Sequence, residues 1–301
     1  MSAPANSLKS ILYALGANLA IAVAKLAAAI HTGSGAMLAE AVHSIADCGN
    51  QGLLIWGLKS ARTPPSPDYP LGWGKAIYFW SFIVAIMLFS LGGLFAIYEG
   101  LHKLGEPEQM EAPWVAIAVL LFSIVAESIS LWGCVREINK VRAGRSLWHW
   151  LRESRQSELV VILGEDIAAL CGLLLALAAV SLAHLAENPL FDALGSIAIG
   201  VLLIVVAVFI GVQIKGLLIG QSVEPGVRRA IQQHLEADGA VAQVFKLITL
   251  QLGSQVMVAV KAQLKADSAE QLVSEINRLE VDLKAAFPEV QWLFFEPDLT
   301  D

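Results

Sequence analysis

The amino-acid sequence predicts an α-helical membrane protein: six transmembrane helices followed by a cytoplasmic α+β domain. Hydrophobic residues make up 56% of the chain, charged residues only 16%, and the mean hydropathy is +0.63. A soluble domain typically holds about 45–50% apolar residues. Six apolar runs precede Gly220, and the pattern then changes to that of a small soluble domain.

Each apolar run is long enough to cross a bilayer, since about 20 helical residues span roughly 30 Å of hydrocarbon. The first run lacks the small-residue cleavage site of a signal peptide, so we expect it to be a retained span. We assign residues 1–220 to a transmembrane domain, with predicted spans at 11–30, 36–58, 76–98, 114–135, 159–185 and 190–219.

The distribution of basic residues predicts the orientation of the spans. The connection between the second and third spans carries Lys59, Arg62 and Lys75, and the one between the fourth and fifth carries six arginines and lysines. The connections after the first and fifth spans carry neither residue type. By the positive-inside rule both termini are cytoplasmic. We therefore expect a multi-pass protein of a bacterial inner membrane.

Residues 221–301 follow the pattern of an αββαβ unit. A helical stretch begins near Pro225, two alternating strands flank Gly253 and Ser254, and a helix at 269–287 precedes a strand at 290–295. Two helices against three strands resemble a ferredoxin-like half-sandwich. Because so small a domain buries little surface alone, we expect it to pair with a second copy in a homodimer. The net charge of −7 argues against a nucleic-acid partner.

Ionisable side chains inside the predicted spans indicate a path for cations. Glu40, His43 and Asp47 fall on one stripe of the second span. With a rise of about 1.5 Å per residue, Asp47, Glu127 and Asp166 come roughly 17 to 20 Å from the outer surface, on three helices. Such carboxylates repel one another unless a cation lies among them or some are protonated. The pattern favours a divalent metal that exchanges with protons, with candidate site residues His43, Asp47, Asp166, Glu127 and Glu165.

Several of these residues have simpler interpretations when taken singly. Glu127 could pair with Lys25 of the first span, and His43 could be a neutral, hydrogen-bonded histidine of a helix bundle. Asn18 and Asn50 could line the transport path with Glu40, or could hydrogen-bond neighbouring helices. The whole set favours a metal site more strongly than any member does.

Other functional classes fit the residues less well. An intramembrane metalloprotease would carry HExxH, which does not occur in the sequence, so we do not expect an enzyme. A metal-sensing receptor would carry a partner-binding motif, and the tail has none. A metal-selective channel also uses acidic residues, and proton coupling distinguishes it from a carrier.

The chain resembles the cation diffusion facilitator family. The resemblance covers six spans, HxxxD in the second span, an acidic fifth span and a cytoplasmic αββαβ tail. The segments AEAVHSIADCGNQ, VAESISL and VVILGEDIAALCG further resemble the branch that includes the mitochondrial zinc exporter of animals.

This resemblance implies export of Zn²⁺ from the cytoplasm against protons, by a homodimer in the lipid bilayer. The cation is then the substrate, and we expect no bound cofactor. His43, Asp47 and Asp166 match ligand positions of the family, whereas Ile162 stands where typical zinc sites have His or Asp. The fourth ligand must come from Glu165, Glu127 or water. Because oxygen ligands suit harder ions, Mn²⁺, Fe²⁺ and Co²⁺ remain alternative substrates.

The tail also differs from the pattern of the family, as Ile162 does in the fifth span. Many relatives bind extra metal there through a histidine shortly before a terminal acidic-Pro pair, where this chain has Phe294. His234 is the sole histidine of the tail. We therefore expect the tail to dimerise the protein without a metal cluster.

Overall fold

A computed structural model describes residues 7–32, 35–105 and 113–300, which form two compact units. The first comprises the described parts of Met1–Lys59, Ile77–Trp150 and Ser157–Lys215, and the second those of Ser60–Ala76, Leu151–Gln156 and Gly216–Asp301. The second unit thus includes segments from two connections between helices as well as the tail. The boundary at residue 220 stays a prediction.

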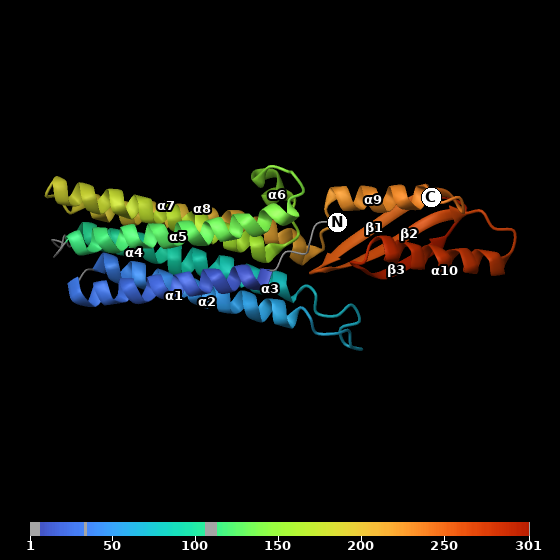
Figure 1. The fold of residues 1–301 in the computed structure, drawn as a ribbon, viewed down its shortest axis with the longest axis horizontal. Coiled ribbons are helices and arrows are strands. Elements are labelled where there is room, and N and C mark those ends of the chain that lie inside the picture. Colours follow the sequence, from blue (N-terminus) through green and yellow to red (C-terminus); the bar gives the residue numbers. More distant parts are fainter. Residues whose placement is uncertain (1–6, 33–34, 106–112, 301) are drawn as a thin grey trace. The chain divides into compact units, whose positions relative to one another are not determined.

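The first unit is a bundle of long helices that run side by side (Figure 1). All six predicted spans are helical, and most of the helices extend past the predicted ends. The helical segments are α1 (Ser7–Thr32), α2 (Gly35–Ser60), α3 (Ala76–Met87), the π-helix η1 (Leu88–Leu94), α4 (Phe95–Gly105), α5 (Pro113–Val141), α6 (Leu147–Glu153), α7 (Ser157–Leu185) and α8 (Leu190–Ile219).

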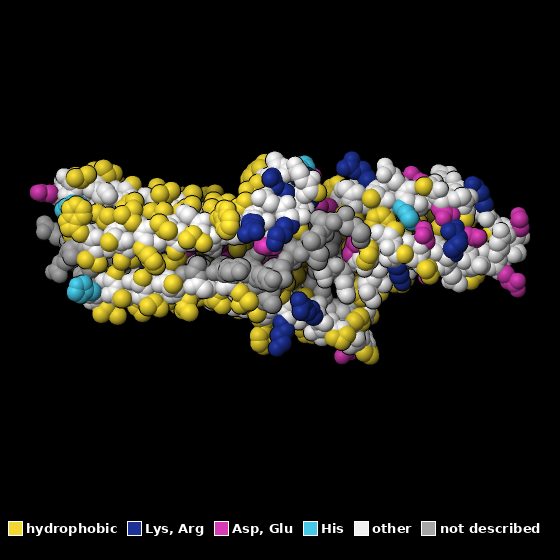
Figure 2. All heavy atoms as spheres, viewed as in Figure 1, with side chains coloured by type: hydrophobic (Ala, Val, Ile, Leu, Met, Phe, Trp, Pro, Cys, Tyr) yellow, Lys and Arg dark blue, Asp and Glu magenta, His cyan; other side chains and the backbone are white. Residues whose placement is uncertain are grey.

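Among the described residues, four helices are long and apolar enough to cross a membrane: Ala76–Gly105, Pro113–Val141, Ser157–Leu185 and Leu190–Ile219. Hydrophobic side chains cover the face of the bundle seen in Figure 2. The helices α1 and α2 have 26 residues each, and the described part of α1 includes the apolar stretch Asn18–Ala28. They carry polar side chains in their middle, including Asn18, Lys25, Asp47, Asn50 and Gln51.

The helix through η1 lies very close to α8. A Cβ atom on Gly200 of α8 would sit 2.7 Å from the backbone oxygen of Gly93, and one on Gly93 would sit 2.5 Å from Cγ1 of Ile204. Such close approach of backbones is typical of small residues between transmembrane helices. The π-helical turn, in which Ser90 Oγ donates to the backbone oxygen of Ile86 over 2.8 Å, has no counterpart in the sequence prediction.

The second unit contains the predicted αββαβ order: α9 (Pro225–Glu236), β1 (Val241–Leu252), β2 (Gln255–Leu264), α10 (Ala269–Ala286) and β3 (Val290–Pro297). The sheet order is β1-β2-β3, with β1 and β2 antiparallel around Gly253, whose φ is 65°. The strands β2 and β3 are parallel neighbours. In a ferredoxin-like fold another strand splits this βαβ unit. The ferredoxin-like topology is therefore not confirmed.

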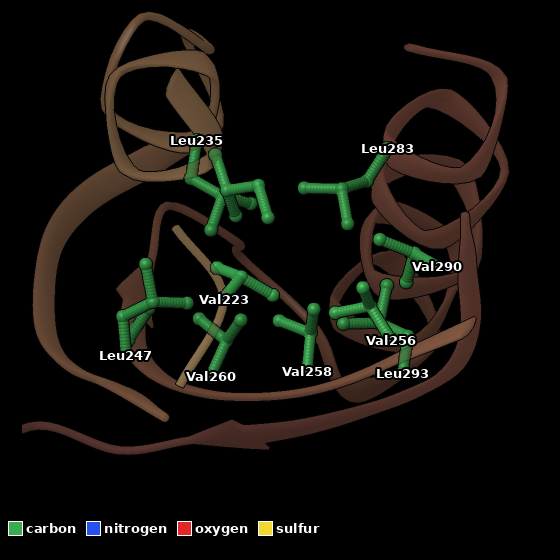
Figure 3. Close-up of a cluster of buried hydrophobic side chains, with 11 residues drawn as sticks. Val223, Leu235, Leu247, Val256, Val258, Val260, Leu283, Val290 and Leu293 are labelled. Atoms are coloured by element: carbon green, nitrogen blue, oxygen red, sulfur yellow. The ribbon is translucent and has the colours of Figure 1, made fainter. Parts of the chain in front are cut away.

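One face of this sheet packs against α9 and α10 (Figure 3). Leu235 of α9 and Leu283 of α10 point toward Val258 and Val260 of β2, and all four side chains are at most 2% exposed. Ser268 is the N-cap residue of α10, and its Oγ accepts a hydrogen bond from the backbone nitrogen of Gln271 over 3.2 Å. Alternation in the strands and helical spacing in α9 and α10 thus produce one small core.

Candidate metal site

Helices α1, α2, α5, α7 and α8 enclose a small pocket inside the first unit. Its polar side chains are Lys25, His43, Ser44, Asp47 and Glu127, and its apolar wall consists of Ala168, Ala169, Gly172, Leu173, Ile199 and Leu203. The pocket therefore brings together three of the side chains that the sequence analysis selected as metal ligands or path residues.

His43 and Asp47 stack one helical turn apart on α2. The His43 Nε2 atom lies 3.6 Å from Asp47 Oδ2, and the two side chains are 16% and 8% exposed. The His43 ring also packs against η1, since a Cβ on Gly92 would lie 3.5 Å from its Nδ1 and Cε1 atoms. The two residues thus present a nitrogen and a carboxylate to the same pocket.

Asp166 lies on α7 and contacts Ser130 of α5. It is 3% exposed, and Ser130 Oγ lies 3.4 and 3.3 Å from its two carboxylate oxygens. Glu127, one turn before Ser130 on α5, is 4% exposed and acts electrostatically on Asp166, as does Asp47. Carboxylates from α2, α5 and α7 therefore lie within electrostatic range of one another.

Glu165 faces α2 beside the pocket. Its Oε1 accepts a hydrogen bond from Asn50 Nδ2 over 2.7 Å, and Asp47 acts on it electrostatically. Within the part of the chain that the structure describes, Glu165 Oε2 and Asn50 Oδ1 are buried without a hydrogen-bond partner. Buried carboxylate and amide oxygens without partners are unusual, and they mark a place where a cation or water fits.

The predicted ligands do not converge on a single point. Among the described residues, no three His, Cys, Asp or Glu side chains are grouped closely enough to hold one ion together. His43, Asp47 and Glu127 line the pocket, while Glu165 and Asp166 lie beside it on α7. The full ligand set thus stays a prediction.

Other predicted residues have separate positions. Asn18 is buried on α1, and its Oδ1 has no partner among the residues that the structure describes. Ile162, one turn before Asp166, is 1% exposed. The side chain of Glu40 lies outside the described residues.

Two contacts of the site were absent from the sequence analysis. Ser130 holds Asp166, and Ser44 accepts a hydrogen bond from Lys25 Nζ over 3.0 Å. For Lys25 the sequence predicted only a pairing with Glu127. The helical spacing of Ser44 to Asp47 and of Ser130 to Glu127 is the signal that could have drawn attention to both serines.

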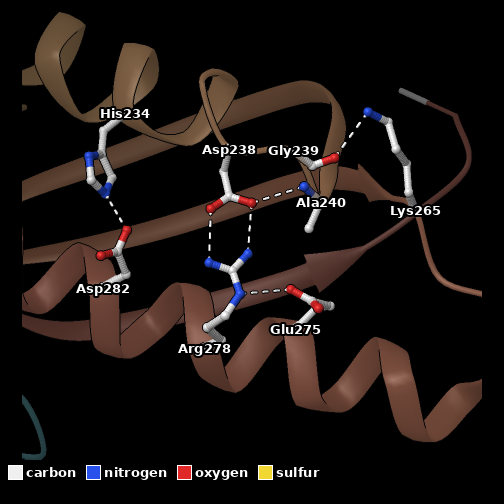
Figure 4. A network of polar contacts seen from close by, with 8 residues as sticks. All are labelled: His234, Asp238, Gly239, Ala240, Lys265, Glu275, Arg278 and Asp282. Carbon is white, nitrogen blue, oxygen red and sulfur yellow. Dashed lines mark hydrogen bonds and ion pairs between the residues drawn. The ribbon is translucent and has the colours of Figure 1, made fainter.

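In the tail, ion pairs join α9 and its following turn to α10 (Figure 4). Asp238 accepts two hydrogen bonds from Arg278, 2.7 and 3.0 Å long, and Arg278 Nε donates to Glu275 over 2.8 Å. The hydrogen bonds from Arg278 lower the pKa of the Asp238 carboxyl. His234, which had no evident partner in the sequence, lies 2.8 Å from Asp282 Oδ2 through its Nε2. Phe294 is 55% exposed.

Comparison with known proteins shows that the sequence of this chain is similar to those of metal transporters. The family model of the cation efflux transmembrane domain matches residues 11–218. The mitochondrial proton-coupled zinc antiporter of Xenopus laevis is 34% identical over 261 residues, which are 86% of this chain and 46% of that protein. Its human counterpart is 34% identical over 231 residues, 76% of this chain and 41% of that protein.

A plant protein is also similar. Metal tolerance protein C4 of Arabidopsis thaliana is 30% identical over 245 residues, which are 80% of this chain and 53% of that protein. This chain therefore spans about half the length of the curated relatives that it matches.

Proposed function

We propose, given that this chain belongs to the cation efflux family, that it carries divalent metal cations, Zn²⁺ foremost, across a membrane in exchange for protons. The match to residues 11–218 and the 34% identical relatives confirm the resemblance to cation diffusion facilitators and to their mitochondrial zinc exporter branch. The chain is an integral multi-pass membrane protein of a transporter family, and we propose no enzymatic activity.

The observation that carries the proposal is the placing of Asp47, Glu127 and Asp166 on three different helices. Each is at most 6% exposed, and each lies within electrostatic range of at least one of the others. In a low-dielectric interior such charges need a cation or protons for compensation. A metal that replaces protons on these groups accounts for both requirements, and it makes binding and proton release one event.

We propose that His43, Asp47 and Asp166 bind the ion, with a fourth ligand from Glu127, Glu165 or water. Mutual repulsion of the carboxylates opposes their convergence, so the cargo itself would draw them together. The buried Ile162 supplies no ligand at the position where a nitrogen is expected. This oxygen-rich set favours Mn²⁺, Fe²⁺ or Co²⁺ as second candidate substrates.

We further propose six spans, with α1 and α2 crossing the membrane beside the four apolar helices. The polar middle of α1 and α2 is compatible with crossing, because ionisable side chains in membranes face the bundle interior. The basic connections and the tail would share one side, and the tail would hold two chains together in a homodimer. The bacterial inner membrane is not confirmed, since the animal relatives carry mitochondrial names.

Flux into proteoliposomes tests the proposal. Purified protein should drive uptake of Zn²⁺ that rises with an imposed pH gradient, and the same assay with Mn²⁺, Fe²⁺ and Co²⁺ ranks the substrates. Lys103→Met, which removes the partner of Asp192 at 2.8 Å outside the pocket, serves as a control that retains uptake. Metal flux that does not change with the pH gradient would instead support a metal-selective channel.

Calorimetry tests the exchange of metal for protons separately. Binding of Zn²⁺ should release protons, and the heat should therefore change with the ionisation enthalpy of the buffer. The variant His43→Gln should release fewer protons than the wild type. Equal heats in all buffers would contradict exchange of metal for protons.

A further inference from the structure

We propose that Lys25 is a tethered cation that compensates the pocket carboxylates when no metal is bound and competes with the arriving metal for them. This inference rests on the proposed function. It concerns a residue of α1, whereas the predicted metal ligands lie on α2, α5 and α7.

The position of Lys25 carries the inference. Its side chain is 3% exposed, and its Nζ atom donates to Ser44 Oγ over 3.0 Å. Ser44 lies between His43 and Asp47 in the sequence of α2, and Lys25 lines the same pocket as His43, Asp47 and Glu127. An ammonium group inside a helix bundle is costly unless negative groups surround it, and here the pocket supplies two carboxylates.

The charge of Lys25 opposes that of the metal. Two like charges a few ångströms apart in a poorly screened pocket repel each other strongly. Either the ammonium withdraws when the metal binds, or the metal binds more weakly than the carboxylates alone would allow. Both outcomes make Lys25 lower the affinity for metal.

The chemistry of lysine suits this role. Its ammonium is a compact charge on a flexible four-carbon stem, so it can move away from the carboxylates while α1 stays in place. Ser44 offers a neutral acceptor for it within the pocket. A carrier must release its substrate as well as bind it, and a built-in competitor that returns to the carboxylates favours release.

Substitution of Lys25 and Ser44 gives opposite expected results. In Lys25→Met the competitor is gone, and calorimetry on the full chain in detergent should show a dissociation constant for Zn²⁺ at least about tenfold lower. Lys25→Arg retains the positive charge and should bind Zn²⁺ close to the wild-type affinity. Ser44→Ala removes the neutral acceptor, which leaves the ammonium to the carboxylates, so Zn²⁺ binding should weaken.

Transport provides a second readout. Lys25→Met should bind Zn²⁺ tightly but turn over more slowly in proteoliposomes, because release becomes harder. Lys103→Met again serves as the control, since it removes a lysine on α4 whose ion pair with Asp192 lies outside the pocket. Its affinity and flux should equal those of the wild type.

The outcomes separate this inference from the proposed function. Wild-type protein that neither binds nor carries Zn²⁺ or another divalent ion would overturn both. Zn²⁺ binding by the wild type that is unchanged or weakened in Lys25→Met would overturn only the competing role of Lys25. Should Lys25→Met fail to fold, Ser44→Ala decides, and an affinity equal to or above that of the wild type would overturn the inference.

Discussion

Asn50 on α2 donates a hydrogen bond from Nδ2 to Oε1 of Glu165 on α7, over 2.7 Å. This bond joins the two helices that carry the predicted ligands Asp47 and Asp166. Asn50 is 1% exposed and Glu165 is 6% exposed. The bond thus links α2 to α7 beside the predicted ligands.

The Asn50–Glu165 bond should contribute to stability. In Asn50→Ala the Glu165 carboxylate loses its donor while staying buried, which should cost about 1–3 kcal/mol of unfolding free energy. Glu165→Gln keeps an acceptor oxygen and removes a buried charge, so it should be at least as stable as the wild type. Thermal unfolding in detergent, followed by circular dichroism, measures both. Equal stability of Asn50→Ala and the wild type would show that the bond contributes little.

Asp47 and Asp166 should each be required for transport. We expect Asp47→Ala and Asp166→Ala to abolish Zn²⁺ uptake into proteoliposomes while the protein stays folded, because each removes a carboxylate from the proposed site. Removal of one of several like charges relieves repulsion, so the metal-free fold should not be weakened. Asp192→Ala is the matched control, since its carboxylate pairs with Lys103 over 2.8 Å outside the pocket. Wild-type uptake by either pocket variant would reject its assignment.

Ile162 should determine which metal is preferred. Ile162→His places a nitrogen ligand one turn before Asp166 and should increase the preference for Zn²⁺ over Mn²⁺. Competition between the two ions in the uptake assay measures the shift, with Ile162→Leu as the control for packing. An unchanged preference in Ile162→His would mean that residue 162 does not face the site. Glu127→Gln and Glu165→Gln identify the oxygen ligand. Substitution of the residue that binds the metal should lower the affinity of the protein for the metal, whereas substitution of the other should not.

The ion pair of the tail should stabilise it only above acidic pH. The Asp238 carboxyl has a lowered pKa in the folded protein, chiefly because Arg278 donates two hydrogen bonds to it. Its contribution is therefore complete above the unfolded pKa of about 3.9 and is lost as the pH falls through the lower folded value. Arg278→Met should lower the opening free energy of β2 at pH 7 by a modest amount, and this deficit should vanish in acid.

Hydrogen exchange of the β2 amides in the full chain measures this contribution, after correction for the intrinsic exchange rate at each pH. Lys284→Met, an exposed substitution on the same helix, is the control and should leave the exchange unchanged at every pH. A deficit of Arg278→Met that persists below the folded pKa would assign the stabilisation to packing of the arginine stem rather than to its charge.

Beyond the site, the structure agrees with the sequence prediction for one span and adds two features that were not predicted. Residues 190–219 were predicted as a span and form α8 with the same bounds, whereas the π-helical turn η1 within residues 76–98 was not predicted. An apolar run indicates a helix but not its hydrogen-bond pattern. In this structure the π-helical turn η1 occurs where Gly93 lies close to Ile204 of α8. The contact between His234 and Asp282 was likewise missed, because its partners are 48 residues apart.

The sequence alone determined the helical runs, the hairpin at Gly253 and the residues whose charge is out of place in hydrocarbon, because these depend on local spacing and composition. Only the tertiary structure decided that Asn50 meets Glu165, that Ser130 meets Asp166 and that Lys25 reaches Ser44. Periodicity shows which residues share a face of one helix, but it does not show how far each helix is rotated about its own axis. That rotation follows from side-chain packing between helices, and it decides which polar groups lie together in the pocket.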